Sequence, residues 1–251
     1  MLVLGQRRRE GALRKLHAGY AWGYLEGSVL LNGGAVMGRG GLPVEVTAAP
    51  LRTVRPLMLR GVYANPEKEL VRFMRAGLVT RIAPGTYTAK PDTVPPDRPW
   101  RPGVEEAAMA YATVQYGPRV PVLYGIGAAR FHHAIPRAIG VVVVAVPQQH
   151  RPVVLAGGGR VLFTTTDVSR LEARFEQSSL GGFLVTTPEQ TVVDLLDRPR
   201  LGGLPAEATA AAGVLADLVD RERVRALAAR GSRTVQAKVE DLFCDEDGRE
   251  G

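Results

Sequence analysis

Three cations in one short segment have the spacing of a polyanion-binding surface. Lys68, Arg72 and Arg75 stand at positions i, i+4 and i+7, so they would share one face of an α-helix, and no acidic residue falls on that stripe. Such side chains bind phosphate oxygens, and arginine also binds the major-groove edge of guanine with two hydrogen bonds. The pattern predicts a helix that contacts DNA. The alternative is an amphipathic helix with a solvated basic face.

Local signals set the bounds of this helix at Pro66 and Ala76. Asn65 offers an N-cap side chain, Pro66 suits the first helical position, and Gly77 ends the helix. The opposite face would pack on a core through three apolar residues: Leu70, Phe73 and Met74.

A β-hairpin is predicted directly after the helix. One strand runs from Leu78 to Ile82, the turn is Ala83 to Thr86, and the chain returns through Tyr87 and Thr88. Arg81 and Lys90 flank this hairpin. Two helices followed by a hairpin is the order of a winged helix-turn-helix, in which a helix enters the major groove and the wing follows the backbone. The predicted DNA-contacting residues are Lys68, Arg72, Arg75, Arg81, Thr86 and Lys90.

The segments before this helix have weaker patterns. We expect helices at Gln6–His17 and Trp22–Leu31, a short strand at Val44–Thr47, and a helix from Pro50 to Leu59 that ends at Gly61.

Charge and composition limit the classes of function. The net charge is +7, and residues 1–99 hold 15 basic against 7 acidic side chains, which places the excess in the N-terminal part. The longest apolar run, Val141–Val146, is far shorter than the ~20 residues that a membrane helix needs. The single cysteine, Cys244, excludes an internal disulfide and a multi-cysteine zinc site. We expect a cytoplasmic, nucleoid-associated protein that binds no membrane, metal or cofactor.

Prolines divide the chain. Residues 91–103 are rich in proline, which favours an extended linker over a helix. We therefore expect a winged helix-turn-helix domain at residues 1–90, this linker, a second domain at residues 104–243, and an acidic tail at residues 244–251. The predicted fold class is α+β, with a mixed α+β second domain.

The second domain shows elements of both kinds. We expect helices at Val104–Tyr116 and Tyr124–Ala134, and a buried strand at Val141–Val146. Two further strands would lie at Val153–Leu155 and Val161–Thr165. A helix opens at Thr187-Pro188-Glu189-Gln190, where Thr187 and Gln190 form a capping box, and it ends before Pro199. Later helices are expected at Pro205–Val219, Arg221–Arg230 and Ser232–Phe243.

Little in this domain predicts catalysis. The triple glycine before Arg160 lacks the Lys-Ser/Thr of a phosphate-binding loop. His132 and His133 are adjacent, so on a helix they would diverge and could not share a metal. Asp194 lies within the helix opened by Thr187, where a carboxylate usually bonds locally or pairs with an arginine. Gln236-Ala237-Lys238, with Asp220 upstream, resembles a metal-dependent nuclease site, although the surrounding apolar spacing is helical. We expect no enzyme activity.

Three segments together resemble the AbiEi family of antitoxins and transcriptional regulators. They are Arg75–Tyr87 (RAGLVTRIAPGTY), Leu123–Ile135 (LYGIGAARFHHAI) and Thr186–Gly203 (TTPEQTVVDLLDRPRLGG), in the family's order. The resemblance implies an N-terminal winged helix that binds inverted repeats in its own promoter. It implies a C-terminal domain that counteracts a nucleotidyltransferase toxin encoded next door, and no catalysis.

The implied partners are double-stranded operator DNA and the cognate nucleotidyltransferase toxin, by direct contact or otherwise. Repeats about one helical turn apart fit two modes of binding. The protein could bind as a symmetric homodimer, or as two monomers side by side. The other readings are a plain winged-helix regulator whose second domain senses a ligand or mediates assembly, and the nuclease.

Overall fold

The structure is a computed structural model that describes residues 41–95 and 97–247. These residues belong to one compact unit that spans residues 35–251. The helices expected at Gln6–His17 and Trp22–Leu31 lie outside the described residues, as do the last four residues of the expected tail. The described residues form a mixed α+β fold with two separate sheets.

The N-terminal part combines short helices with a small antiparallel sheet. Its element order is α2 (Val44–Thr47), the 3-10 helix η2 (Pro50–Arg52), β1 (Thr53–Val54), the 3-10 helix η3 (Pro56–Leu59), α3 (Pro66–Arg75), β2 (Val79–Ala83) and β3 (Thr86–Ala89). The strand order is β1-β3-β2. A small core joins these elements through buried apolar side chains that include Val46, Val54, Leu59, Leu70 and Phe73.

Helix α3 and the β2–β3 hairpin agree with the sequence prediction. Asn65 caps α3 by accepting a hydrogen bond from the Lys68 amide at 3.1 Å. The hairpin turns at Pro84 and Gly85, and Gly85 has a φ of +64°, a conformation that favours glycine.

Two predictions before α3 were wrong. Val44–Thr47 is a single helical turn, not a strand, and it buries Val46 in the small core. The helix expected from Pro50 to Leu59 is broken by strand β1, where the Thr53 and Thr88 hydroxyls lie 2.7 Å apart across the sheet. Pro56 favours this break because the residue before a proline, here Arg55, avoids the helical conformation.

The C-terminal part is built on a six-stranded mixed sheet. The strands are β4 (Val122–Tyr124), β5 (Val141–Val146), β6 (Val153–Val154), β7 (Arg160–Thr165), β8 (Ala173–Ser178) and β9 (Gly181–Thr186). Their order is β6-β7-β5-β4-β9-β8, with parallel pairs β5–β7 and β4–β9. The helices are α4 (Val104–Tyr116), α5 (Ile126–Phe131), the 3-10 helix η4 (Val168–Arg170), α6 (Pro188–Asp197), α7 (Pro205–Ala216), α8 (Arg221–Ala228) and α9 (Arg233–Asp247).

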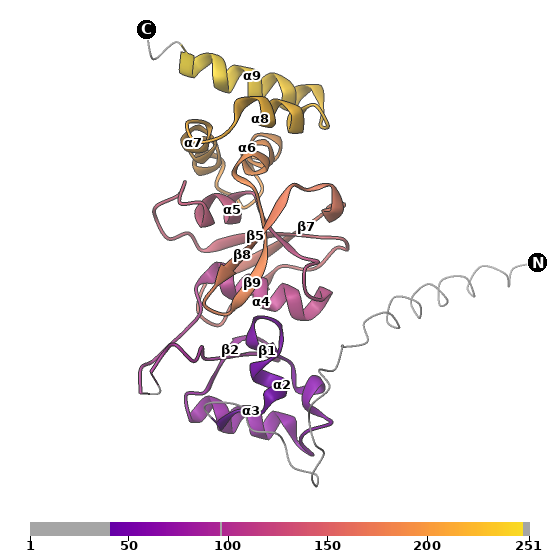
Figure 1. Ribbon diagram of the computed structural model, residues 1–251, viewed down its shortest axis with the longest axis vertical. Helices are drawn as coiled ribbons and strands as arrows, with labels where there is room; N and C mark the ends of the chain where they lie inside the picture. Colours follow the sequence, from indigo (N-terminus) through magenta and orange to yellow (C-terminus); the bar gives the residue numbers. More distant parts are fainter. Residues whose placement is uncertain (1–40, 96, 248–251) are drawn as a thin grey trace, which may run out of the picture. The chain divides into compact units, whose positions relative to one another are not determined.

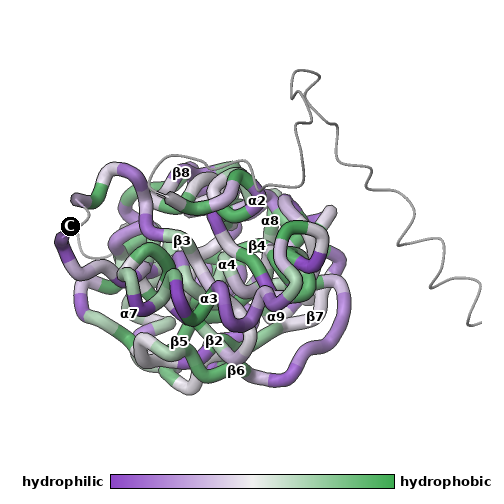
Figure 2. The backbone as a smooth tube through the Cα atoms, turned by 90° about the horizontal axis from the view of Figure 1, so that it is seen from below, coloured by the Kyte–Doolittle hydropathy of each residue, from purple (hydrophilic) through white to green (hydrophobic). Residues whose placement is uncertain are grey.

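Strand β5 lies between the two layers of helices (Figure 1). Val143 and Ala145 pack into a core with α5 to α9, whereas Val142, Val144 and Val146 pack into a second core with α4. All six residues of β5 are buried, as expected for a continuous apolar run, and β4 and β5 stand out as hydrophobic in Figure 2.

The sequence analysis also missed three strands of the six-stranded sheet. Val122–Tyr124 is strand β4, so the helix expected at Tyr124–Ala134 is only the short α5. Ala173–Ser178 and Gly181–Thr186 form an antiparallel hairpin that was not predicted. Helix α9 also continues to Asp247, so the expected acidic tail begins inside a helix.

The small sheet and the C-terminal part share a core. Leu51, Ile82 and Ala83 belong to the same buried cluster as α4 and β5. The Ala156 amide, in the loop after β6, donates a hydrogen bond to the Ile82 carbonyl at 2.8 Å. The hairpin is therefore fixed to the C-terminal part on one side, and the predicted linker is not the only connection.

Candidate nucleic-acid interface

Helix α3 presents all three of its predicted cations to solvent. Leu70 and Phe73 are buried in the small core, which turns Lys68 and Arg75 outward. Met74, predicted to face inward, is 39% exposed at the edge of this helix. The buried face is therefore narrower than the sequence pattern indicated.

Arg72 is exposed, but a carboxylate balances its charge. Its guanidinium forms an ion pair with Glu69, with Nη2 at 2.7 Å and Nε at 2.8 Å from Oε2. The guanidinium also lies over the Phe73 ring, 4.9 Å from the ring centre. The stripe was predicted to be purely basic, but Glu69 stands three residues before Arg72 and reaches it. Lys68 and Arg75 carry the larger share of the positive field of α3.

The hairpin contributes one exposed cation and one buried hydroxyl. Arg81 is exposed, and its Nε donates to the Ala83 carbonyl at 3.4 Å. Thr86 is fully buried, and its hydroxyl has no partner among the described residues. It was predicted to contact DNA from the wing, but its side chain points inward because it pairs with Ala83 directly after a register shift in β2.

Lys90 is half-buried, and its Nζ donates to the carbonyl of Arg98 at 2.5 Å. The lysine therefore holds the linker against the hairpin. Thr80 makes a second connection of this kind, because its hydroxyl donates to the Trp100 carbonyl at 3.3 Å. The linker packs back on β2 and brings its own arginines to a pocket beside the hairpin.

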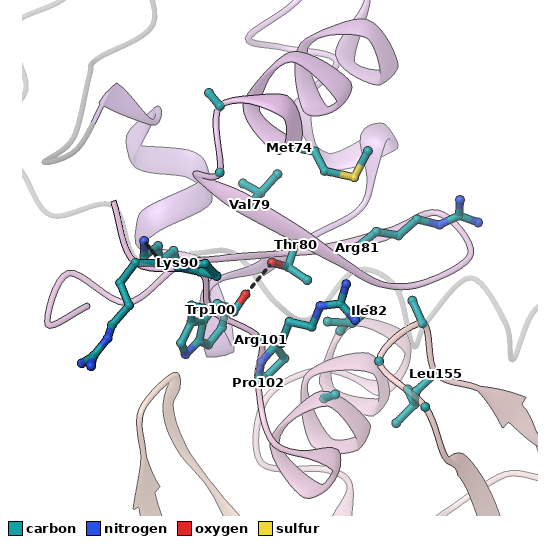
Figure 3. Close-up of a pocket in the computed structure, with 18 of the residues that line it drawn as sticks. Met74, Val79, Thr80, Arg81, Ile82, Lys90, Trp100, Arg101, Pro102 and Leu155 are labelled. Carbon is teal, nitrogen blue, oxygen red and sulfur yellow. Dashed lines mark hydrogen bonds between the residues drawn. The ribbon is translucent and has the colours of Figure 1, made fainter. Parts of the chain in front are cut away.

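Arg98 and Arg101 are the cations that the sequence analysis missed. With Arg75 and Arg81 they line a pocket of about 590 Å³ below β2 (Figure 3). Both arginines were visible in the sequence, but the proline-rich segment was interpreted as a spacer. No local pattern indicates that it folds back on the hairpin.

A buried carboxyl is the main titratable feature of the C-terminal part. Asp194 of α6 is 3% exposed, and the Gln190 side-chain amide donates to its Oδ1 at 2.8 Å. The expectation that Asp194 bonds locally is confirmed. Burial raises the pKa of Asp194 to about 7, because the charged form loses its solvation, and the Gln190 hydrogen bond offsets part of this rise. Burial likewise raises the pKa of Tyr124.

Two of the residues that resemble a nuclease site make structural contacts. Lys238 lies on helix α9 and donates from Nζ to the Leu196 carbonyl at 2.8 Å. Asp220 caps α8 by accepting from the amides of Glu222 and Arg223. Among the residues that the structure describes, no group of three or more His, Cys, Asp or Glu side chains could hold a metal ion.

The two adjacent histidines follow the end of α5 and do not lie on the helix that was expected there. His132 Nε2 lies 2.7 Å from the Thr186 carbonyl, which ties the end of α5 to the end of β9. His133 is exposed and has a φ of +63°. The two rings face different surroundings.

Comparisons with known proteins give a fold relative. No protein-family model matches the chain, and no curated protein matches it. Among solved structures, the chain is similar to the crystal structure of the RV2827C protein from Mycobacterium tuberculosis. The TM-score is 0.54 and the identity 17%, over 85% of this chain and 80% of that chain. This similarity concerns the fold alone. None of the described helices is long and apolar enough to cross a membrane.

Proposed function

We propose that this protein is a DNA-binding repressor of its own operon and an antitoxin against a nucleotidyltransferase. The observation that carries the proposal is a capped helix with exposed Lys68 and Arg75, followed directly by a hairpin that exposes Arg81. The preceding elements support it. Short helical turns lie on either side of β1, and α3, β2 and β3 follow in a sheet of order β1-β3-β2. This order supports the proposal of a winged helix-turn-helix.

The exposed cations have distinct tasks in this proposal. Helix α3 enters the major groove with Lys68 and Arg75 toward the duplex, and Arg81 meets a phosphate from the hairpin. Arginine can bind a guanine edge bidentately, whereas lysine acts as a point charge. Arg72 contributes less than its position indicates, because binding a phosphate requires it to leave Glu69.

The antitoxin part rests on the resemblance to the AbiEi family. Two of the resembling segments, Leu123–Ile135 and Thr186–Gly203, pack on each other in the C-terminal part. Helix α5 contacts α6, the Thr186 hydroxyl donates to the Leu123 carbonyl at 3.4 Å, and His132 Nε2 lies 2.7 Å from the Thr186 carbonyl. A joint role for these segments is thereby favoured over two unrelated matches.

Binding to the protein's own upstream DNA tests the repressor. A labelled duplex is titrated at two salt concentrations in the presence of non-specific competitor. We expect a retained, sequence-specific complex whose affinity falls steeply with salt, because phosphate contacts release counterions. Absence of a complex at low salt would show that the basic face is only solvated.

A charge-matched pair of variants assigns the surface. Lys68→Ala with Arg75→Ala should weaken binding by roughly 100-fold or more, since hydrogen bonds to charged groups contribute about 1.5–3 kcal/mol each. Arg230→Ala with Arg233→Ala removes the same charge from exposed positions near α8 and α9 and should leave affinity within about twofold. Equal losses in both variants would indicate non-specific attraction.

Co-expression tests the antitoxin. A neighbouring nucleotidyltransferase gene should be toxic alone and harmless with this protein, also when the Lys68 and Arg75 variants have lost operator binding. Without such rescue, the function would be that of a plain winged-helix regulator. The pocket beside the hairpin favours this second candidate, because it gives a regulator a place to sense a ligand.

A further inference from the structure

A pocket lies where the hairpin, the linker and the C-terminal part meet. Its volume of about 590 Å³ falls within the range of small-molecule sites, roughly 300–1,000 Å³. Five parts of the chain line it: the end of α3 with β2, Lys90 after β3, the linker from Asp97 to Pro102, the first turn of α4, and the loop after β6. All five belong to the same compact unit.

The lining combines cations with a flat aromatic ring. Arg75, Arg81, Arg98 and Arg101 all border the pocket, and no carboxylate of the described residues forms an ion pair with any of them. Asp97 is the single acidic residue of the lining. Guanidinium groups of this kind bind phosphate oxygens in pairs of hydrogen bonds.

Trp100 supplies the aromatic surface. It is half-buried, and the hydrogen bond from Thr80 to its carbonyl fixes its backbone. Figure 3 shows Trp100 and Arg101 next to each other below β2, while Arg81 extends outward along the strand. The apolar wall beside them includes Ile82 and Leu155. A planar ring can stack on this indole while its charged group meets the arginines.

We propose that this pocket binds a nucleoside phosphate, and that the bound nucleotide weakens DNA binding. The inference rests on the proposed function, because Arg75 and Arg81 belong both to the pocket and to the DNA-contacting set. A phosphate that engages these two arginines competes with the phosphates of the duplex. The coupling is reciprocal, so DNA lowers nucleotide affinity by the same factor. The pocket then provides a route to release the operator.

Nucleotide binding is measured on the full-length chain with adenosine monophosphate. Trp22→Phe is introduced throughout, so that the fluorescence reports on Trp100, the other tryptophan of the chain. We expect saturable quenching by adenosine monophosphate and at least roughly tenfold weaker binding of adenosine or inorganic phosphate, each of which lacks half of the recognised groups. If adenosine monophosphate does not bind, or binds no better than both fragments, the proposal is wrong.

Two variants separate this inference from the proposed function. Arg98→Ala with Arg101→Ala removes pocket cations outside the DNA-contacting set, and it keeps the Arg98 carbonyl that Lys90 binds. It should weaken nucleotide binding by roughly tenfold or more and change operator affinity little. Lys68 lies outside the pocket lining, so Lys68→Ala should weaken operator binding and change nucleotide binding little.

The competition itself gives the last readout. Saturating adenosine monophosphate should lower operator affinity by roughly 5–150-fold in the parent protein, and by much less in the Arg98 and Arg101 variant. If that variant loses DNA binding as strongly as Lys68→Ala and the nucleotide has no effect, the linker arginines belong to the DNA surface. That result would overturn the pocket and leave the repressor intact.

Discussion

Helices α3 and α6 begin alike and end in opposite surroundings. Each has ten residues, starts with Pro-Glu, and is capped by a side chain that accepts a hydrogen bond from the amide three residues on. Seven residues after the cap, α3 has Arg72, whose side chain is 65% exposed, whereas α6 has Asp194, which is 3% exposed. The local pattern is nearly the same, but the environment differs.

The difference lies in what covers each helix. Helix α3 packs on η3 and β2 and keeps a free face. Helix α6 contacts α5, α7, α8, α9 and β9, so that its polar positions are enclosed as well. A cap and a proline determine where a helix starts, but its neighbours in the fold determine whether a charge on it remains ionised. The cations of α3 can act on a partner, whereas the carboxyl of α6 acts on stability.

The largest effect is expected from exchanging the two charges. Asp194→Arg places a cation in the closed interior and should lower the free energy of unfolding by at least about 3–5 kcal/mol, or prevent folding. Arg72→Asp, on the exposed helix, should cost less than about 1 kcal/mol despite repulsion from Glu69. Urea denaturation measures both. Asp194→Asn is the size-matched neutral control, and similar costs for both exchanges would contradict the contrast.

A smaller effect is a pH dependence specific to α6. The folded pKa of Asp194 is about 7, above the ~3.9 of an unfolded aspartate, so between these values the folded state binds the extra proton. Stability from this group is therefore present below about pH 4 and is lost as the pH rises through 7. The total is as much as roughly 4 kcal/mol.

The measurement is the urea midpoint as a function of pH. The parent protein should lose stability across this window, and Asp194→Asn should lose less, since the amide stays neutral and can still accept from Gln190. Arg72→Gln should leave the slope unchanged. A slope that persists in the Asp194 variant would assign the pH effect to another group.

The smallest effect concerns the two caps, where the helices should behave most alike. Asn65→Ala and Thr187→Ala should each cost about 1 kcal/mol, within a range of about 0.5–2 kcal/mol. Thr187 should lie at the upper end because it is buried and its hydroxyl also approaches Glu172. Serine at either position should restore most of the lost stability. Thermal melting measures the four variants. An alanine variant that melts at the parent temperature would show that its helix does not depend on the cap.

This contrast also separates what the sequence could predict from what it could not. Helix α3, helix α6, strand β5 and the β2–β3 hairpin follow from local signals, namely caps, turn residues and periodicity. Strand β8 has no such signal, because it lies at the edge of the sheet and alternates poorly. Its partner β9 starts with two glycines, and a Cβ at Gly182 would lie 2.2 Å from the exposed Phe175 ring, so a larger residue there requires this ring to move.

The candidate site divides in the same way. The sequence pattern predicted DNA-contacting cations, and the structure exposes three of them: Lys68, Arg75 and Arg81. Thr86 was misplaced because a register shift in the hairpin changes which side chains face the core. Arg98 and Arg101 depend on a linker that folds back, and that contact joins residues distant in the chain. Local spacing does not contain such information.

The shared core has a consequence for exchanging parts between proteins. Leu51, Ile82 and Ala83 complete the apolar layer that α4 and β5 also build. A chimaera that replaces residues 41–90 with a foreign DNA-binding module would leave that layer open unless the new module supplied apolar side chains at the same places. Under the proposed function, operator preference would therefore change more readily by substitutions on the outer face of α3 than by exchange of whole segments.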